Sequence, residues 1–518
     1  MMRRLIAVCW VVALCGCARA PDAPNTLRLR LDADPSTLDP ARIVDVSGGE
    51  IAGKIFAGLV RVGETGEPVP ELAATVAVSD DGLVYTFVLK DEARFSNGRP
   101  LTSADVRYSF ERLLSPKTAS PRRWVLGRID GADDYAQGKA GSVQGIETPD
   151  ENTVLLKLEK PFGPFLSLLT MPNAAIVPQE VVEAWGEDFG SHPVGAGPFL
   201  LESWQRDVRL VLRRNPHYSD GPKLDCMEYE IIPEDFAASS EFETGNLDIL
   251  QLSPADIPRY NASSRLRSLV TSHVGLNTYY LGFICDRAPF DDVRLRHAVS
   301  HAIDRQKIID SVLAGSAVVA DGPVPPTILP AADERQAPGY DPKVAIRLIA
   351  EAGGAPETIG LYLSSGREEL SVCEAIQEYL RKVGLDVELH MLEWSSFKDA
   401  VSRGEPDIFY LSWWADYPDP ENFLFPTFHS SNWGSAGNRS RFASPEVDAA
   451  IETAVAETDA ATRADGYAQV EKLVVEAAPW VFLWHRKQFV AVQPRVVGFR
   501  FFPIRSADRG VQLSLREG

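Results

Sequence analysis

The chain has 518 residues and carries 52 basic against 72 acidic side chains, which gives a formal net charge of -20 at pH 7. This length is too great for one simple hydrophobic core, so we expect two or three domains. The acidic balance argues against a nucleic-acid partner, because phosphate binding requires clustered lysine and arginine. It is compatible with a soluble receptor that accepts cationic solutes.

The first residues have the pattern of an export signal. Two arginines precede the apolar stretch 5–14, which is too short to span a bilayer. Residues 14–17 (Leu-Cys-Gly-Cys) resemble a lipobox, which predicts a signal peptide over residues 1–16 and a lipid on Cys17, anchoring the protein to a membrane. The alternative is ordinary cleavage after the A-x-A pattern at 18–20, which would leave a free protein. In both cases the chain is exported.

Neither the cysteines nor the histidines predict a metal site or a cofactor. Cys226, Cys285 and Cys373 are scattered, so they make no disulfide framework, although one bridge is possible. His297 and His301 have the i,i+4 spacing that a metal could use. No HExxH glutamate or third ligand accompanies them, so we interpret them as ordinary helix surface.

Alternating and helically spaced apolar residues predict an α/β protein in the first half of the chain. The pair Thr102 and Asp105 has the spacing of a capping box that opens a helix. The expected elements are strands at residues 26–31, 85–90, 154–158, 200–204 and 208–213, and helices at residues 51–59 and from 102 onward.

The second half of the chain repeats a helix–strand rhythm. This order implies a mixed or parallel sheet, whose ligand sites lie beyond the carboxyl ends of the strands. Arg367 and Asp416 both follow strands in this way, which predicts an anion-binding and a cation-binding group on the walls of one cleft. The expected elements are strands at residues 279–285, 359–363, 385–391, 407–411, 480–484 and 496–502, and helices at residues 293–308, 342–353, 369–383, 445–455 and 462–477.

The stretch 411–428 is unusually rich in aromatic side chains around one acid. Trp413, Trp414 and Tyr417 flank Asp416, and two prolines that follow at once predict a stiff loop. A carboxylate in a desolvated aromatic cleft is costly unless a cation comes to it. The stretch therefore predicts a receptor for a positively charged group. The alternative is that the aromatic residues are core and the acids cap a turn.

The run Trp-Ala-Asp-Tyr-x-Asp-Pro-x-x-Phe at residues 414–423 resembles the ligand-binding loop of the periplasmic oligopeptide- and dipeptide-binding proteins of ABC importers. Further blocks resemble the same family in the same order. They are Ser-Thr-Leu-Asp-Pro at 36–40, a dense block at 69–114, Gly-Asn-Leu-Asp-Ile at 245–249 and the terminal strand at 496–502. The resemblance therefore extends over essentially the whole mature chain.

This resemblance implies an α/β fold, a two-lobed clamp of the periplasmic-binding-protein type with mixed sheets, a hinge crossed twice and an extra third domain. Lobe I would consist of residues 24–63 with 186–272 and 490–518. The extra α/β domain would comprise residues 64–185, and lobe II residues 273–489.

The resemblance also implies a function. The protein would be a monomeric extracytoplasmic solute receptor of the periplasm that captures short peptides and delivers them to the permease subunits of an ABC transporter. Asp416 would bind the α-ammonium of the peptide, with Trp413, Trp414 and Tyr417 in the pocket wall. Arg367 is the candidate for the peptide carboxylate, against the alternative of a solvated surface arginine. The family also serves nickel complexes, sugars and haem-like ligands, so a non-peptide solute is the alternative ligand.

An exported enzyme is the third class that we considered. Ser395 and Lys398 have the S-x-x-K spacing of penicillin-binding enzymes, but the KTG and SDN motifs that would accompany it are lacking. No GxSxG elbow occurs in the sequence. We therefore expect no enzymatic activity.

Overall fold

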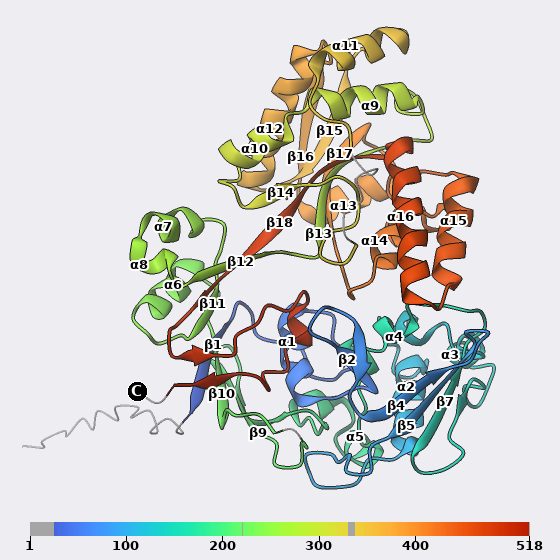
Figure 1. Cartoon of the computed structure of the whole chain (residues 1–518), viewed down its shortest axis with the longest axis vertical. Helices are drawn as coiled ribbons and strands as arrows, with labels where there is room; N and C mark the ends of the chain where they lie inside the picture. The colour runs from blue at the N-terminus through green and yellow to red at the C-terminus, as the bar shows by residue number, and fades with distance from the viewer. Residues whose placement is uncertain (1–24, 220, 330–336, 517–518) are drawn as a thin grey trace, which may run out of the picture.

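The computed structural model describes residues 25–219, 221–329 and 337–516 (Figure 1). The chain forms two lobes, one above the other in Figure 1, and contains three main sheets. The predicted fold class, two lobes built on mixed α/β sheets, is confirmed. The predicted signal peptide and the lipidation site at Cys17 lie outside the described residues.

The lower lobe contains a four-stranded mixed sheet, which we call the lobe I sheet. Its order is β1-β10-β9-β8, with β1 parallel to β10 and the remaining neighbours antiparallel. Apolar side chains of α1 pack against it in one core. The elements of this region are β1 (Thr26–Leu31), α1 (Val46–Ile55), β2 (Val60–Val62), β3 (Pro68–Pro70), α5 (Gln179–Trp185), β8 (Phe199–Gln205), β9 (Arg209–Arg214) and β10 (Cys226–Ile231).

A second, antiparallel sheet of order β4-β5-β7-β6 lies beside the first, at the lower right of Figure 1. We call this sheet and its helices the extra domain. The capping box of Thr102 and Asp105 is present and starts α2 as predicted. The elements are β4 (Ala73–Val78), β5 (Val84–Leu89), α2 (Ser103–Leu114), α3 (Ala132–Ala136), β6 (Ile146–Glu147), β7 (Thr153–Lys157) and α4 (Phe165–Leu168).

The upper lobe is built on a mixed sheet in which β15 is parallel to β16 and β17, whereas β13 is antiparallel to β17 and β18. Its strands are β13 (Asn277–Phe283), β14 (Ala317–Val319), β15 (Ile359–Ser364), β16 (Val387–Leu392), β17 (Ile408–Trp414) and β18 (Trp480–Val492). Its helices are α9 (Val293–Ala302), α10 (Arg305–Ser311), α11 (Pro342–Glu351), α12 (Arg367–Lys382), α13 (Trp394–Arg403), α14 (Glu421–Phe428), α15 (Pro445–Ala456) and α16 (Ala460–Ala477).

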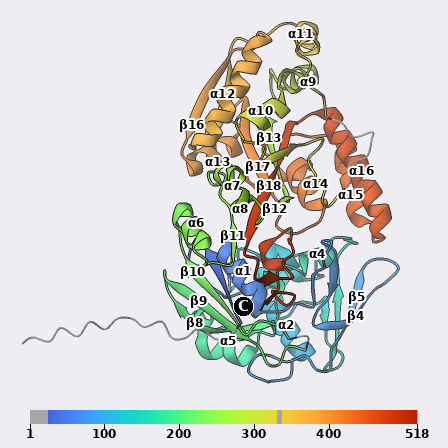
Figure 2. The same ribbon diagram turned by 60° about the vertical axis from the view of Figure 1, so that its left-hand side comes forward.

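The chain passes between the two lobes twice. The first passage is the short link from β12 (Val270–Val274) to β13, and the second is the long strand β18. The first half of β18 pairs with β13, and its second half pairs with β12 and β11 (Ile249–Gln251). Figures 1 and 2 both show β12 and β18 running side by side from one lobe to the other. The predicted double crossing of the hinge is therefore present.

The helix expected at residues 51–59 begins and ends earlier, as α1. The carboxylate of Asp45 caps it by accepting the Gly48 N–H at 2.7 Å. Gly53 lies inside this helix because the C-terminal segment passes close by. A Cβ at Gly53 would lie 2.1 Å from the carbonyl oxygen of Ser506. Gly53 therefore makes room for a distant part of the chain.

Three further boundaries differ from expectation. The helix predicted at 293–308 is divided into α9 and α10, because Ile303 is extended and Asp304 caps the second helix. The stiff loop expected at 411–428 is confined to residues 415–420, since β17 continues to Trp414 and α14 follows. The terminal strand expected at 496–502 is only the two-residue β19 (Val496–Val497), which pairs with β20 (Ser514–Leu515).

Among the described residues, no helix combines the length and the apolar character that crossing a membrane requires. Cys226, Cys285 and Cys373 carry free thiols. The described residues contain no group of three or more potential ligands that could hold a metal ion. His297 and His301 each lie within hydrogen-bonding distance of a backbone carbonyl instead.

Candidate functional site

Asp416 lies in the six-residue loop between β17 and α14, at the carboxyl end of a strand as predicted. The strand is held between β13 and β15, which fixes the start of the loop. The Ala415 N–H then donates to the Leu276 carbonyl at 3.0 Å, and the Asp416 N–H donates to Asn422 Oδ1 at 3.0 Å. The backbone on both sides of the Asp416 side chain is therefore anchored.

The three acids of this stretch have different environments. Asp419 and Glu421 are buried, and Asp419 accepts the Glu421 N–H at 2.9 Å, so it caps the start of α14. Burial raises the pKa of the Glu421 carboxyl to about 7, and the buried Tyr417 hydroxyl donates to this group. Burial also raises the pKa of Asp419. The turn-capping interpretation therefore applies to Asp419, whereas the Asp416 side chain is 38% exposed.

Asp416 lines a cleft of about 650 Å³ between the upper lobe and the extra domain. One wall comes from the end of β17 and from α14, the other from the region that follows α2. In Figure 1, α14, α15 and α16 stand above α3 and α4 on this side of the molecule. The cleft is lined by aromatic side chains from both walls, namely Trp124, Phe162, Trp413, Tyr417 and Phe425.

An ion pair joins the two walls of this cleft. Arg122 Nη1 lies 3.2 Å from Asp416 Oδ1, and the arginine side chain is 24% exposed. Beside this pair, the rings of Trp124 and Tyr417 have centroids 6.3 Å apart. The guanidinium of Arg128 lies over Phe425 of the opposite wall, 5.7 Å from the ring centroid. The acid that we predicted to receive a cation therefore already contacts one from the protein itself.

The structure brings together three of the five predicted ligand-binding residues. Asp416, Trp413 and Tyr417 line the same cleft, and the indole nitrogen of Trp413 is buried with no hydrogen-bond partner among the described residues. Trp414 is 46% exposed, and its ring lies edge-on to Tyr279 outside the cleft. Arg367 is an exposed residue in the first turn of α12 and does not line the described cleft.

Sequence reasoning did not find the opposite wall of the cleft. Arg122, Arg123 and Trp124 line it, at and just before the short 3-10 helix η1 (Arg123–Leu126). A basic and aromatic run is visible there in the sequence, but Arg122 and Asp416 are 294 residues apart. No local pattern connects two segments at that distance.

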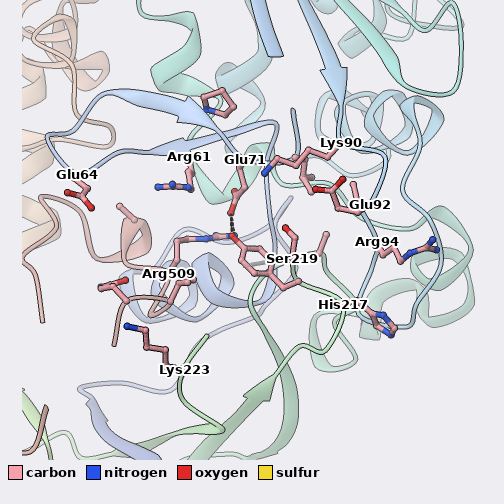
Figure 3. Close-up of a pocket in the computed structure, with 18 of the residues that line it drawn as sticks. Arg61, Glu64, Glu71, Lys90, Glu92, Arg94, His217, Ser219, Lys223 and Arg509 are labelled. Atoms are coloured by element: carbon pink, nitrogen blue, oxygen red, sulfur yellow. Dashed lines mark hydrogen bonds and ion pairs between the residues drawn. The ribbon is translucent and has the colours of Figure 1, made fainter. Parts of the chain in front are cut away.

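A second cavity, of about 410 Å³, lies in the lower lobe and is drawn in Figure 3. Basic residues outnumber acidic ones around it, and it shares none of its described lining with the Asp416 cleft. At its centre the guanidinium of Arg509 lies 2.6 Å from a carboxylate oxygen of Glu71. Both side chains are nearly buried, at 11% and 4% exposure. This pair ties the C-terminal segment to the lower lobe.

Comparison with known proteins places the chain among bacterial receptors. A family model of bacterial extracellular solute-binding proteins, family 5, matches residues 67–435. The chain is 31% identical, over 91% of its length and 90% of the relative's, to a probable D,D-dipeptide-binding periplasmic protein, DdpA, from Escherichia coli strain K12. It is equally identical to heme-binding protein A of Haemophilus influenzae, over 83% of its length and 81% of the relative's.

The fold is similar to that of a solved receptor. The unliganded open form of the periplasmic murein tripeptide-binding protein MppA superimposes with a TM-score of 0.82 at 27% identity. The match covers 95% of this chain and 97% of that protein. The two lobes are therefore arranged similarly to those of that protein. By its sequence and its fold, the chain belongs to the bacterial extracellular solute-binding proteins of family 5.

Proposed function

We propose that the protein is an extracytoplasmic receptor that captures short peptides and delivers them to the permease subunits of an ABC transporter. The observation that carries this proposal is the position of Asp416. Of the three acids at residues 411–428, it alone is partly exposed, in a cleft between the upper lobe and the extra domain and among aromatic rings. A peptide's α-ammonium is a cation that such a carboxylate can bind. Relatives named for dipeptide and murein-peptide binding support this ligand class.

Hinge closure would commit the ligand to transport. The lobes are joined by β12 and β18, so a change in a few backbone angles there can bring the cleft walls together. Closure removes water and strengthens the pairing of Asp416 with the ammonium. A peptide carbonyl could then accept the indole N–H of Trp413, which has no partner among the described residues. Trp414 and Arg367 are candidates for contacts that form only on closure.

The remaining features of the proposal follow from the sequence. The three-domain division keeps the predicted boundaries except that β3 and α5, at the two ends of the predicted extra domain, are grouped with lobe I. The mature protein is a monomer in the periplasm, held to a membrane by a lipid on Cys17. Its role is binding rather than catalysis. Ser395 supports this, because its hydroxyl donates to Glu393 at 2.6 Å, while the ammonium of Lys398 lies over the ring of Trp394.

A non-peptide solute is the second candidate ligand. Heme-binding protein A is as similar to this chain as the dipeptide-binding relative is. An anionic or uncharged ligand would not need a carboxylate at position 416. The two candidates therefore differ in whether binding requires a free amine.

The test is titration calorimetry of the purified mature protein with di-, tri- and tetrapeptides, including L,L- and D,D-dialanine, each beside its N-acetylated form. We expect the free amines to bind and both acetylation and Asp416→Asn to weaken binding at least tenfold. Asp80→Asn, an exposed acid outside the cleft, is the matched control. Binding that is unaffected by acetylation and by Asp416→Asn would remove Asp416 from the role. Absence of binding to every peptide would favour the non-peptide solute.

A further inference from the structure

We propose that Arg122 and Asp416 together recognise a zwitterion. The ligand's ammonium replaces Arg122 at Asp416, and the ligand's carboxylate then binds the released guanidinium. The inference rests on the proposed function, and it identifies the ligand class as very short peptides with both termini free. It assigns the carboxylate partner to the extra domain, on the wall opposite Asp416.

Each of the two side chains has the other as its partner. Arg122 Nη1 and Asp416 Oδ1 are 3.2 Å apart, and neither side chain has another hydrogen-bond or ion-pair partner among the described residues. The two residues belong to different walls of the cleft. A ligand that takes one of them away from this pair leaves the other without a partner, and a ligand that carries both charges supplies a partner to each.

The extra-domain wall of the cleft is basic. Arg122, Arg123 and Arg128 all line it, accompanied by the acids Asp133 and Glu159. Arg128 lies against the rings of Phe162 and Phe425, and its charge also acts on the buried Glu421 carboxyl of the opposite wall. An amine that brought only its positive charge would add to this excess of guanidinium groups. A carboxylate in the same ligand would offset that repulsion and offers the planar, bidentate geometry that arginine prefers.

The position of Arg122 beside Asp416 also limits the length of the ligand. An extended chain advances about 3.3–3.6 Å per residue, so the two termini of a dipeptide are within roughly 7 Å of each other. The ammonium occupies the position that the guanidinium of Arg122 leaves beside Asp416. That guanidinium needs to withdraw by only a few ångströms to meet the carboxylate of a dipeptide. In a tetrapeptide the carboxylate would lie well beyond this reach, so the affinity should fall with length beyond three residues.

A different role for Arg122 predicts the opposite result. If the arginine only competes with the ligand's ammonium for Asp416, removing it would tighten the binding of every amine, whatever the state of the carboxyl terminus. If the arginine binds the carboxylate, removing it weakens free peptides and leaves C-terminal amides nearly unchanged. The two roles are therefore distinguished by the carboxyl terminus of the ligand.

The experiment is titration calorimetry with L,L-dialanine, D,D-dialanine and alanyl-phenylalanine, each as the free peptide and as its C-terminal amide. The proteins are the wild type, Arg122→Gln, Arg122→Lys and Lys117→Gln. We expect Arg122→Gln to weaken free dipeptides at least tenfold and the amides less than threefold, with partial recovery in Arg122→Lys. Lys117→Gln, which removes an exposed cation of the extra domain that does not line the cleft, is the control and should change each dissociation constant less than threefold.

Three results would overturn the inference. One is tighter binding of free dipeptides by Arg122→Gln, and another is equal weakening of peptides and amides. A wild type that binds amines but does not distinguish dipeptides from their amides would likewise contradict the zwitterion while leaving the peptide receptor intact. A wild type that binds no peptide would instead contradict the proposed function itself. Thermal unfolding of each variant verifies that it is folded.

Discussion

Two ion pairs in this molecule join segments that are far apart in the chain, and they differ in burial. Arg122 and Asp416 meet across the cleft between the upper lobe and the extra domain, with side chains 24% and 38% exposed. Arg509 and Glu71 meet inside the lower lobe, at 11% and 4% exposure, where the carboxylate also lies 3.2 Å from the Gly58 N–H (Figure 3). Each pair combines a guanidinium with a carboxylate, so their chemistry is the same.

The difference in burial separates a structural contact from an exchangeable one. An exposed pair contributes about 0–1 kcal/mol, because water solvates each partner well when the pair separates. A ligand can therefore replace one partner at little cost. Removing one partner of a buried pair leaves an uncompensated charge and costs about 3–5 kcal/mol. The comparison identifies the Asp416 cleft as the part of the molecule suited to binding and the Glu71 region as part of the scaffold.

The largest loss of stability is expected from Glu71→Ala. The substitution leaves the buried guanidinium of Arg509 without its carboxylate, so the free energy of unfolding should fall by about 3–5 kcal/mol. Urea unfolding followed by circular dichroism measures this change. Glu64→Ala, which removes an exposed ion pair with Arg500, is the control and should cost less than about 1 kcal/mol. Equal losses in both variants would contradict the distinction by burial.

The next largest change in stability is expected at Glu421, the buried acid that follows the Asp416 loop, and it depends on pH. Burial raises the pKa of Glu421 from 4.5 to about 7 in the folded protein. Between about pH 4.5 and 7 the unfolded chain releases this proton while the folded chain keeps it, so stability falls as the pH rises. In the wild type this lowers the free energy of unfolding by about 2–3 kcal/mol across the window. Glu421→Gln should abolish this decrease, so the variant should be more stable than the wild type above pH 7. Unfolding curves at pH 4.5, 6 and 7.5 give the difference from the wild type. Parallel pH profiles in both proteins would show that Glu421 is not the group responsible.

A smaller effect is expected when the exchangeable pair is broken. Arg122→Ala and Asp416→Ala should each change the free energy of unfolding by less than about 1 kcal/mol, because both side chains retain access to water. The same urea titrations measure this. A loss comparable to that of Glu71→Ala would mean that the pair belongs to the scaffold and is not available to a ligand.

The smallest effect is expected at Arg367. Its side chain is exposed in the first turn of α12, so Arg367→Ala should change stability by less than about 0.5 kcal/mol. Since we assign the carboxylate of a dipeptide to Arg122, the dissociation constant for dialanine should change less than threefold. A tenfold weakening in calorimetry would transfer the carboxylate partner to Arg367 and to the upper lobe.

Much of the fold could be predicted because the signals are local. The alternating run at β1 and the capping box at α2 are properties of a few neighbouring residues, and the structure has both. The errors arise where distant segments decide the outcome. The helix expected at residues 51–59 ends at Ile55, and a Cβ at Gly53 inside it would lie 2.1 Å from the carbonyl oxygen of the distant Ser506.

The candidate site likewise contains one residue that local sequence predicts and one that it does not. Asp416 could be found because its loop follows a strand and carries a recognisable run of residues. Its partner Arg122 could not, because no local pattern relates two side chains 294 positions apart. The burial of the three acids at residues 411–428 could not be predicted, because it depends on packing with distant segments. Asp419 and Glu421 are buried, whereas Asp416 is partly exposed in the cleft that Glu421 also lines.

The lower lobe is assembled from both ends of the chain, which has a consequence for the order in which the protein matures. Strand β1 and helix α1 come first, but Lys54 donates to the carbonyl of Asp508, 454 positions later, at 3.0 Å. Leu513 also belongs to the same hydrophobic core as β1 and α1, so part of the apolar surface of this earliest segment stays uncovered until nearly the whole chain has emerged. A chain that is cut short near its end should lose the lobe that is synthesised first rather than the one synthesised last.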